Sequence, residues 1–219
     1  MLNLRQRSGF SFRHSFGQLD DVMACVESDY AALTDRASTF GHIRWGALCK
    51  KHEKKPIFGV ELLVVESIGE KKTPSFLATF IATESVEPIY EMFGIATQQF
   101  KYEPRLKYDD VNAFISSGKG VVIIGNGARL DRIVRSDRCF VAVGPETTKE
   151  YALTALDLGF GVVAVGNNVY PTAFDRGAYE VLCGRNAESQ SYPQHIIQES
   201  EWRLKWGREI GRASCRERV

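Results

Sequence analysis

Short, continuous apolar runs that alternate with helical patterns constrain this chain more than any other feature. The clearest run spans residues 56–65, and others lie at 29–34, 76–82, 121–124, 139–143 and 162–165. Apolar residues recur at helical spacing over 19–27, 41–51, 86–98, 108–116 and 147–158. Runs without polar alternation suit strands covered on both faces. The alternation predicts a parallel α/β sheet or barrel, with about seven strands if residues 2–4 are counted.

The charge balance and the cysteines exclude several classes of protein. The 28 Lys and Arg against 27 Asp and Glu give a net charge of +1, which does not provide a general electrostatic grip on nucleic acid. The five cysteines are far apart and form no CxxC pair, so a zinc ribbon and a thioredoxin motif are excluded. The sequence has no 18-residue apolar run and no apolar stretch after its first basic residues. We therefore expect a cytoplasmic chain with no membrane partner.

Several motifs then resemble one known family, in that family's order. Residues 4–11 resemble Leu-His-x-His-Ser-x-Tyr-Ser, which opens the PHP (polymerase and histidinol phosphatase) domain of the bacterial DNA polymerase III alpha subunit. Residues 31–36 resemble the second motif, Ala-Leu-Thr-Asp-His, and 55–61 match Lys-Pro-Ile-x-Gly-x-Glu. Further similar segments lie at 40–45, 100–105, 120–124, 161–170, 178–183 and 201–205. The resemblance implies a distorted (β/α)7 barrel over residues 1–206.

The family's active members hold a metal cluster at the mouth of the barrel, and this sequence departs from that pattern. Arginine replaces histidine at three motif positions, and only two acidic ligands are kept. The positions that the resemblance assigns to the former pocket are Arg5, Arg7, His14, Asp35, Arg36, Glu61, Asn168 and Tyr170. We therefore expect no catalytic residue and no metal ligand set in this chain.

The chemistry of the replacements supports this expectation. A guanidinium is permanently charged and has no lone pair to give to a cation. We expect Arg5, Arg7 and Arg36 to fill the space of the metals, paired with Asp35 and Glu61. The alternative is that the arginines point outward and have no structural use.

Two functional hypotheses follow from the resemblance. The first is the N-terminal domain of a replicative DNA polymerase, acting as a structural module that can dock a proofreading exonuclease subunit. The remainder of that polymerase would contact DNA and would use magnesium at its palm; this chain would itself be inactive and without a cofactor. The alternative is a free-standing, metal-dependent phosphoesterase of the same superfamily with a rearranged site, built from His14, Asp35, Glu61 and His42, in which arginines bind phosphate.

Other candidates have simpler interpretations. Residues 125–127, Gly-Asn-Gly, follow a strand but lack a third glycine and a Gly-Lys-Ser/Thr, so a tight turn is favoured over a phosphate loop. Ser8 and Ser11 lie near His14, but no Gly-x-Ser-x-Gly elbow supports a nucleophile. His42 is interpreted as a packing or surface residue, and His52 as part of a solvated helix end. Residues 207–219 resemble translated vector sequence, with a native basic tail as the alternative.

Overall fold

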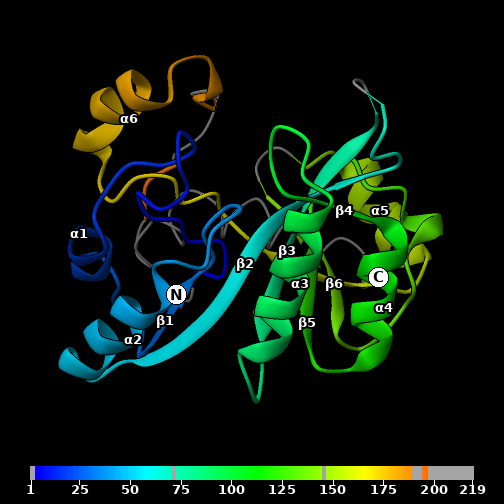
Figure 1. Ribbon diagram of the computed structural model, residues 1–219, viewed down its shortest axis with the longest axis horizontal. Coiled ribbons are helices and arrows are strands. Elements are labelled where there is room, and N and C mark those ends of the chain that lie inside the picture. Colours follow the sequence, from blue (N-terminus) through cyan, green and yellow to red (C-terminus); the bar gives the residue numbers. More distant parts are fainter. Residues whose placement is uncertain (1–2, 71–72, 145–146, 189–193, 197–219) are drawn as a thin grey trace, which may run out of the picture.

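The computed structural model describes residues 3–70, 73–144, 147–188 and 194–196 (Figure 1). The expected boundary at 206 and the tail at 207–219 lie outside these residues. The strands are β1 (Tyr30–Leu33), β2 (Lys55–Val65), β3 (Ser75–Ala82), β4 (Arg105–Lys107), β5 (Gly120–Ile124), β6 (Cys139–Val143) and β7 (Gly161–Ala164). The helices are α1 (Leu19–Ala24), α2 (His42–Lys51), α3 (Glu87–Gln98), α4 (Tyr108–Ser117), α5 (Lys149–Asp157) and α6 (Arg176–Cys183), with 3-10 turns η1 (Leu130–Arg132), η2 (Ala173–Asp175) and η3 (Gly184–Asn186).

The strands form a mixed sheet that curls into a partial barrel, with helices around it (Figure 1). Its order is β1-β2-β3-β5-β6-β7, and β4 pairs with β2. The prediction of a parallel sheet is wrong for β3, which runs antiparallel to both β2 and β5. Residues 66–74 are too few for a crossover helix, and such a short connection favours an antiparallel pair. The remaining pairs are parallel, as expected.

The N-terminal segment connects the two ends of the sheet. Gln6 forms a parallel bridge with Asn168, just after β7, and the amide of Arg7 donates to the Asn168 carbonyl at 3.1 Å. On its other side the Gln6 carbonyl accepts a hydrogen bond from the amide of Thr34 at 2.8 Å. Of the strand expected at residues 2–4, residue 2 lies outside the described residues and residues 3 and 4 are not in a strand; this segment pairs only through the bridge at Gln6. The seventh strand is β4, a short strand that the apolar pattern missed.

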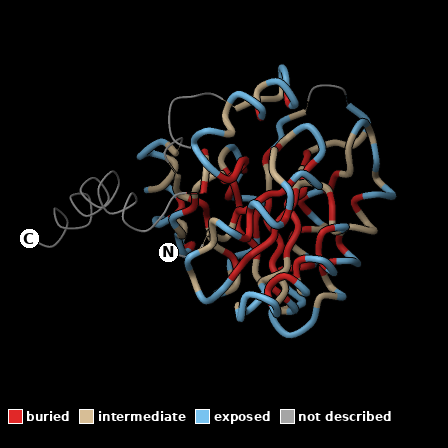
Figure 2. The backbone as a smooth tube through the Cα atoms, turned by 90° about the vertical axis from the view of Figure 1, so that its left-hand side faces the viewer, coloured by how far each residue is buried: buried red, intermediate tan, exposed pale blue. Residues whose placement is uncertain are grey.

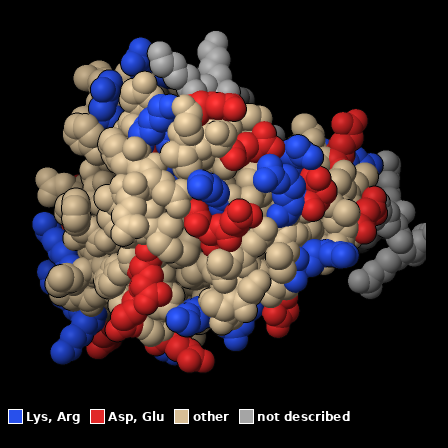
Figure 3. All heavy atoms as spheres, turned by 45° about the vertical axis from the view of Figure 1, so that its right-hand side comes forward, with Lys and Arg blue, Asp and Glu red and all other residues tan. Residues whose placement is uncertain are grey.

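The apolar core lies between the sheet and its covering helices, and the buried residues in Figure 2 occupy the middle of the molecule. The largest cluster joins β2, β3 and β5 to α3 and α4. A second cluster packs α1 and α2 on β1 around the fully buried Trp45, whose indole N–H donates to the Ala31 carbonyl. On the face drawn in Figure 3, acidic and basic side chains are interspersed. None of the described helices is both long and apolar enough to cross a membrane.

Candidate functional site

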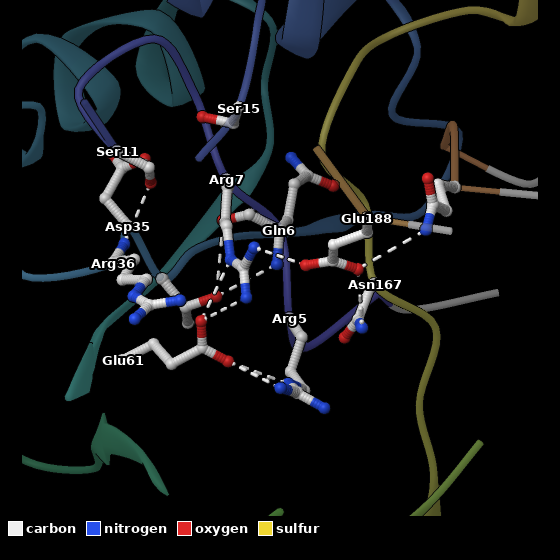
Figure 4. A network of polar contacts seen from close by, with 12 residues as sticks. Arg5, Gln6, Arg7, Ser11, Ser15, Asp35, Arg36, Glu61, Asn167 and Glu188 are labelled. Atoms are coloured by element: carbon white, nitrogen blue, oxygen red, sulfur yellow. Dashed lines mark hydrogen bonds and ion pairs between the residues drawn. The ribbon is translucent and has the colours of Figure 1, made fainter. Parts of the chain in front are cut away.

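The centre of the candidate site is Glu61, a buried carboxylate in the middle of β2. Arg5 donates from Nε and Nη2 to Glu61 Oε1 at 3.0 and 2.6 Å. Arg7 donates from Nε and Nη2 to Oε2 at 2.9 and 2.5 Å. Figure 4 shows the carboxylate between the two guanidinium groups. Burial alone would raise the pKa of Glu61, but the charges of Arg7 and Arg5 outweigh it and hold the pKa at about 2.

The side chain of Arg7 also reaches a second carboxylate. Its Nη1 donates to Glu188 Oε1 at 3.1 Å. Glu188 lies just after η3, and its other oxygen accepts from Asn167 and Gln194. Burial would lower the pKa of the Arg7 guanidinium, but Glu61 and Glu188 raise it well above its usual value. The guanidinium is therefore charged at every accessible pH.

Asp35 has partners of a different kind from those expected. Its Oδ1 accepts from the Ser8 amide at 2.6 Å and from the Ser11 hydroxyl at 2.7 Å, and the Ser8 hydroxyl donates to Oδ2 at 2.9 Å. The expectation that Asp35 pairs with an arginine is wrong for the described residues, because hydroxyl and amide donors occupy its oxygens. Burial raises the pKa of Asp35 to about 6, although the hydrogen bonds from Ser11 and Ser8 oppose this effect.

Arg36 also departs from the expected pairing. Its backbone bridges Glu61, but its Nη2 donates to Glu103 Oε2 at 2.9 Å, so the side chain is drawn to the loop before β4. The Nε of Arg36 is buried and has no hydrogen-bond partner among the residues that the structure describes. His14 is half-buried and interacts electrostatically with Arg36 and Arg7. Burial, followed by the charges of Arg36 and Arg7, lowers the pKa of His14 to about 4.

The last two pocket positions belong to different surroundings. Asn168 is buried beside the N-terminal segment, where its backbone N–H donates to the backbone carbonyl of Arg5 at 3.3 Å. The ring of Tyr170 packs against that of Tyr179 in α6 in a tilted arrangement, with the ring centroids 5.1 Å apart. The structure therefore joins Arg5, Arg7 and Glu61 directly, places Asn168 beside them, and gives Tyr170 a packing position.

The weaker candidates of the sequence also have structural positions. Residues 125–127 enter a turn, in which Gly127 has a φ of +85° that favours glycine. His42 is buried, contacts Phe58 and Tyr90, and hydrogen-bonds the Gly59 carbonyl through Nε2, as a packing residue does. His52 is exposed at the end of α2.

Sequence reasoning missed the carboxylates of Glu103 and Glu188. They are partners of Arg36 and Arg7 at separations of 67 and 181 residues. No local pattern marks them, since an acidic residue on a loop looks the same whether or not an arginine reaches it. Only the tertiary fold brings the charges together.

The donor set of this site does not fit a divalent metal. Both oxygens of Glu61 are held by guanidinium groups, and Arg5, Arg7 and Arg36 would repel a cation. Among the described residues, no group of three or more His, Cys, Asp or Glu side chains could hold a metal ion. We therefore derive no chemical step through a metal at this site.

Asp35 leads to a prediction about pH. A carboxyl whose folded pKa is about 6, above its ordinary 3.8, is protonated more readily in the folded chain than in the unfolded chain. Ionisation of Asp35 therefore removes about 3 kcal/mol of folded-state stability as the pH rises from about 3 to about 7, whereas the lowered pKa of His14 acts in the opposite direction. The Asp35→Asn variant cannot ionise and is expected to lack this loss. Chemical denaturation of both proteins across this range measures it, and parallel curves would contradict the assignment.

Comparisons with known proteins bear on the fold. No protein-family model matches the chain, and no curated protein sequence matches it. A solved amidohydrolase from Chromobacterium violaceum, described with bound sulfate and no metal, aligns over 78% of this chain and 88% of its own, with 12% identity and a TM-score of 0.51. The chain shares its fold with this amidohydrolase. A structure described as a putative metal-dependent phosphoesterase from Bifidobacterium adolescentis covers 96% of this chain and 98% of its own, with 12% identity and a TM-score of 0.46.

The likeness concerns the fold alone, and it agrees with the predicted barrel class. The mixed sheet curls as a partial barrel with helices on its outside, in agreement with the α/β barrel predicted from the sequence.

Proposed function

We propose that this chain is a barrel of the PHP type in which a buried arginine–glutamate network stands in place of a metal centre, and that it acts as a non-catalytic module. One observation carries the proposal: both oxygens of Glu61 are engaged by Arg5 and Arg7. A carboxylate used in this way has no lone pair directed at a cation, and its arginine partners cannot ligate one. The network joins the N-terminal segment to β2 and so helps to close the barrel.

A second part of the proposal concerns the larger protein to which this module belongs. The order of its motifs supports the N-terminal domain of a replicative DNA polymerase, in which the module would support the polymerase chain and dock an exonuclease subunit. The flanking nucleotide sequence tests this setting. A reading frame that continues beyond residue 206 into a palm domain with paired aspartates would support it, and a stop codon there would contradict it.

A free-standing hydrolase is the second candidate, and the comparison with the Chromobacterium protein favours it. That protein is described as an amidohydrolase rather than as part of a polymerase. The buried Nε of Arg36, which lacks a hydrogen-bond partner in the described part of the chain, could serve such an enzyme by binding a substrate oxyanion. Hydrolysis of a chromogenic aryl phosphate by the purified chain, lost in Glu61→Gln and in Arg36→Gln, would support this candidate over the non-catalytic one.

The proposal predicts that the purified chain retains no stoichiometric zinc or manganese after dialysis. Its reason is the engagement of Glu61 by two arginines. Elemental analysis by plasma mass spectrometry measures the metal content. The double variant Arg5→His, Arg7→His places two imidazoles beside Glu61 and is the matched control, expected to take up more zinc than the wild type. Stoichiometric metal in the wild type would contradict the proposal.

A further inference from the structure

The Glu188 carboxylate occupies a small site formed by donors from three separate segments. Arg7 donates from Nη1 to Oε1 at 3.1 Å. Asn167 donates from Nδ2 to Oε2 at 3.1 Å, and Gln194 donates from Nε2 to the same oxygen at 3.4 Å. Figure 4 shows Glu188 between Arg7 and Asn167. One guanidinium and two amides are thus directed at a single anion.

Burial separates the donors from their anion. The Arg7 side chain is 2% exposed and Gln194 is fully buried, whereas the Glu188 side chain is 26% exposed. Arg7 and Gln194 therefore belong to the interior of the protein, and Asn167 is half-buried. The Glu188 carboxylate reaches these donors from the protein surface.

The charges of the network require an anion at this position. Arg5 and Arg7 share the single negative charge of Glu61, so these three directly paired groups carry a net charge of +1. Glu188 brings the total to zero. A buried positive charge without a partner is strongly unfavourable, so an anion at the position of the Glu188 carboxylate is worth more than an exposed ion pair.

The backbone of Glu188 is anchored independently of its carboxylate. Its amide donates to the hydroxyl of Tyr179 at 2.9 Å, and its carbonyl accepts from Arg176 Nη2 at 3.0 Å. Both partners lie on α6, where Arg176 also lies over the rings of Tyr170 and Tyr179. Removal of the Glu188 side chain therefore leaves these backbone contacts in place.

We propose that Arg7, Asn167 and Gln194 form an oxyanion-binding site, that Glu188 is its tethered resident anion, and that a free phosphate or carboxylate group binds there when Glu188 is withdrawn. A guanidinium fork with flanking amide donors suits both a carboxylate and a phosphate group. The tether gives Glu188 a high effective concentration, so it competes with free ligands. The inference goes beyond the non-catalytic role, because it assigns a ligand class to the network.

The test is anion binding by Glu188→Ala. Isothermal titration calorimetry with inorganic phosphate is expected to show binding to this variant at least about tenfold tighter than to the wild type, in which the tethered carboxylate competes. The thermal midpoint of the variant should fall and then rise with added phosphate, in excess of the rise produced by sodium chloride at the same ionic strength. Acetate and sulfate titrations separate a carboxylate preference from a tetrahedral one.

Glu103→Ala is the matched control. It also removes a carboxylate from an arginine, Arg36, but at a position without the two amide donors. No recovery specific to phosphate is expected for it. Asn167→Ala in the Glu188→Ala background should weaken phosphate binding severalfold. If Glu188→Ala does not fold, Glu188→Ser also removes the carboxylate while leaving room for phosphate and is tested in the same way.

Two outcomes would overturn the inference. One is phosphate affinity in Glu188→Ala, or in Glu188→Ser, no tighter than in the wild type. The other is recovery by chloride equal to recovery by phosphate, which would show only ionic screening. Both are independent of the metal content of the chain, so this inference and the proposed function can fail separately.

Discussion

Replacement of Glu61 by alanine is expected to lower the free energy of unfolding by about 3–5 kcal/mol, because it leaves two buried guanidinium groups without their shared carboxylate. Arg5 and Arg7 are 7% and 3% exposed, so water cannot replace the lost partner cheaply. Urea denaturation of the purified variant and the wild type measures the difference. Glu61→Gln keeps the shape but not the charge, and it should also be strongly destabilising.

An exposed ion pair is the control for this prediction. Arg44 pairs with Asp20 on the surface, where their side chains are 59% and 50% exposed. Arg44→Ala is expected to cost less than about 1 kcal/mol. Simultaneous replacement of Arg5, Arg7 and Glu61 by apolar residues should cost less than the sum of the three single changes, because no buried charge is left behind. A Glu61→Ala cost no larger than that of Arg44→Ala would show that the network does not stabilise the barrel.

Gly59→Ala is expected to be the other strongly destabilising change, by about 1–3 kcal/mol. Gly59 lies two residues before Glu61, where β2 pairs closely with β3. A Cβ there would lie 2.4 Å from the Phe80 carbonyl oxygen and 3.0 Å from Thr34 Cγ2. The nearer atom belongs to the backbone, so the strands themselves must shift. Thermal denaturation followed by circular dichroism measures the loss.

Gly94→Ala is the matched control for this glycine. Gly94 lies within α3, and a Cβ there would meet nothing within 4 Å. Because alanine is the better helix former, this change should stabilise the protein by about 0.5–1 kcal/mol. Changes of the same sign and size at Gly59 and Gly94 would contradict the argument that β2 and β3 approach too closely at Gly59 to admit a Cβ atom.

Together these experiments separate two possible uses of the site. If the network stabilises the barrel, stability falls on removal of Glu61, and metal content stays substoichiometric. If it binds a substrate, the purified chain hydrolyses an aryl phosphate, and this activity depends on Glu61 and Arg36. The tethered Glu188 adds a third measurement, since phosphate binding on its removal reports the charge of the network directly.

The sequence by itself determined the elements and the chemical character of the site. Continuous apolar runs produced β2, β3, β5 and β6 nearly to their ends, because a strand covered on both faces needs apolar residues at every position. The run at 162–165 also produced β7, although most residues of that strand are exposed. Helical spacing likewise predicted α2, α3, α4 and α5. The arginines at positions 5 and 7 predicted a pocket unsuited to metals, because that conclusion depends only on guanidinium chemistry.

Only the tertiary structure decided the direction of β3, the place of β4 and the partners of each charge. The run at 76–82 is equally apolar in a parallel and in an antiparallel pair, so its apolar pattern does not give the direction of the strand. The short connection to β2 favours the antiparallel direction that the structure shows. Both oxygens of Glu61 were taken by Arg5 and Arg7, which left Asp35 to serine donors and Arg36 to Glu103. Such pairings depend on distances between residues far apart in the chain. A local pattern carries no information about them, because Coulomb and hydrogen-bond energies depend on separation in space.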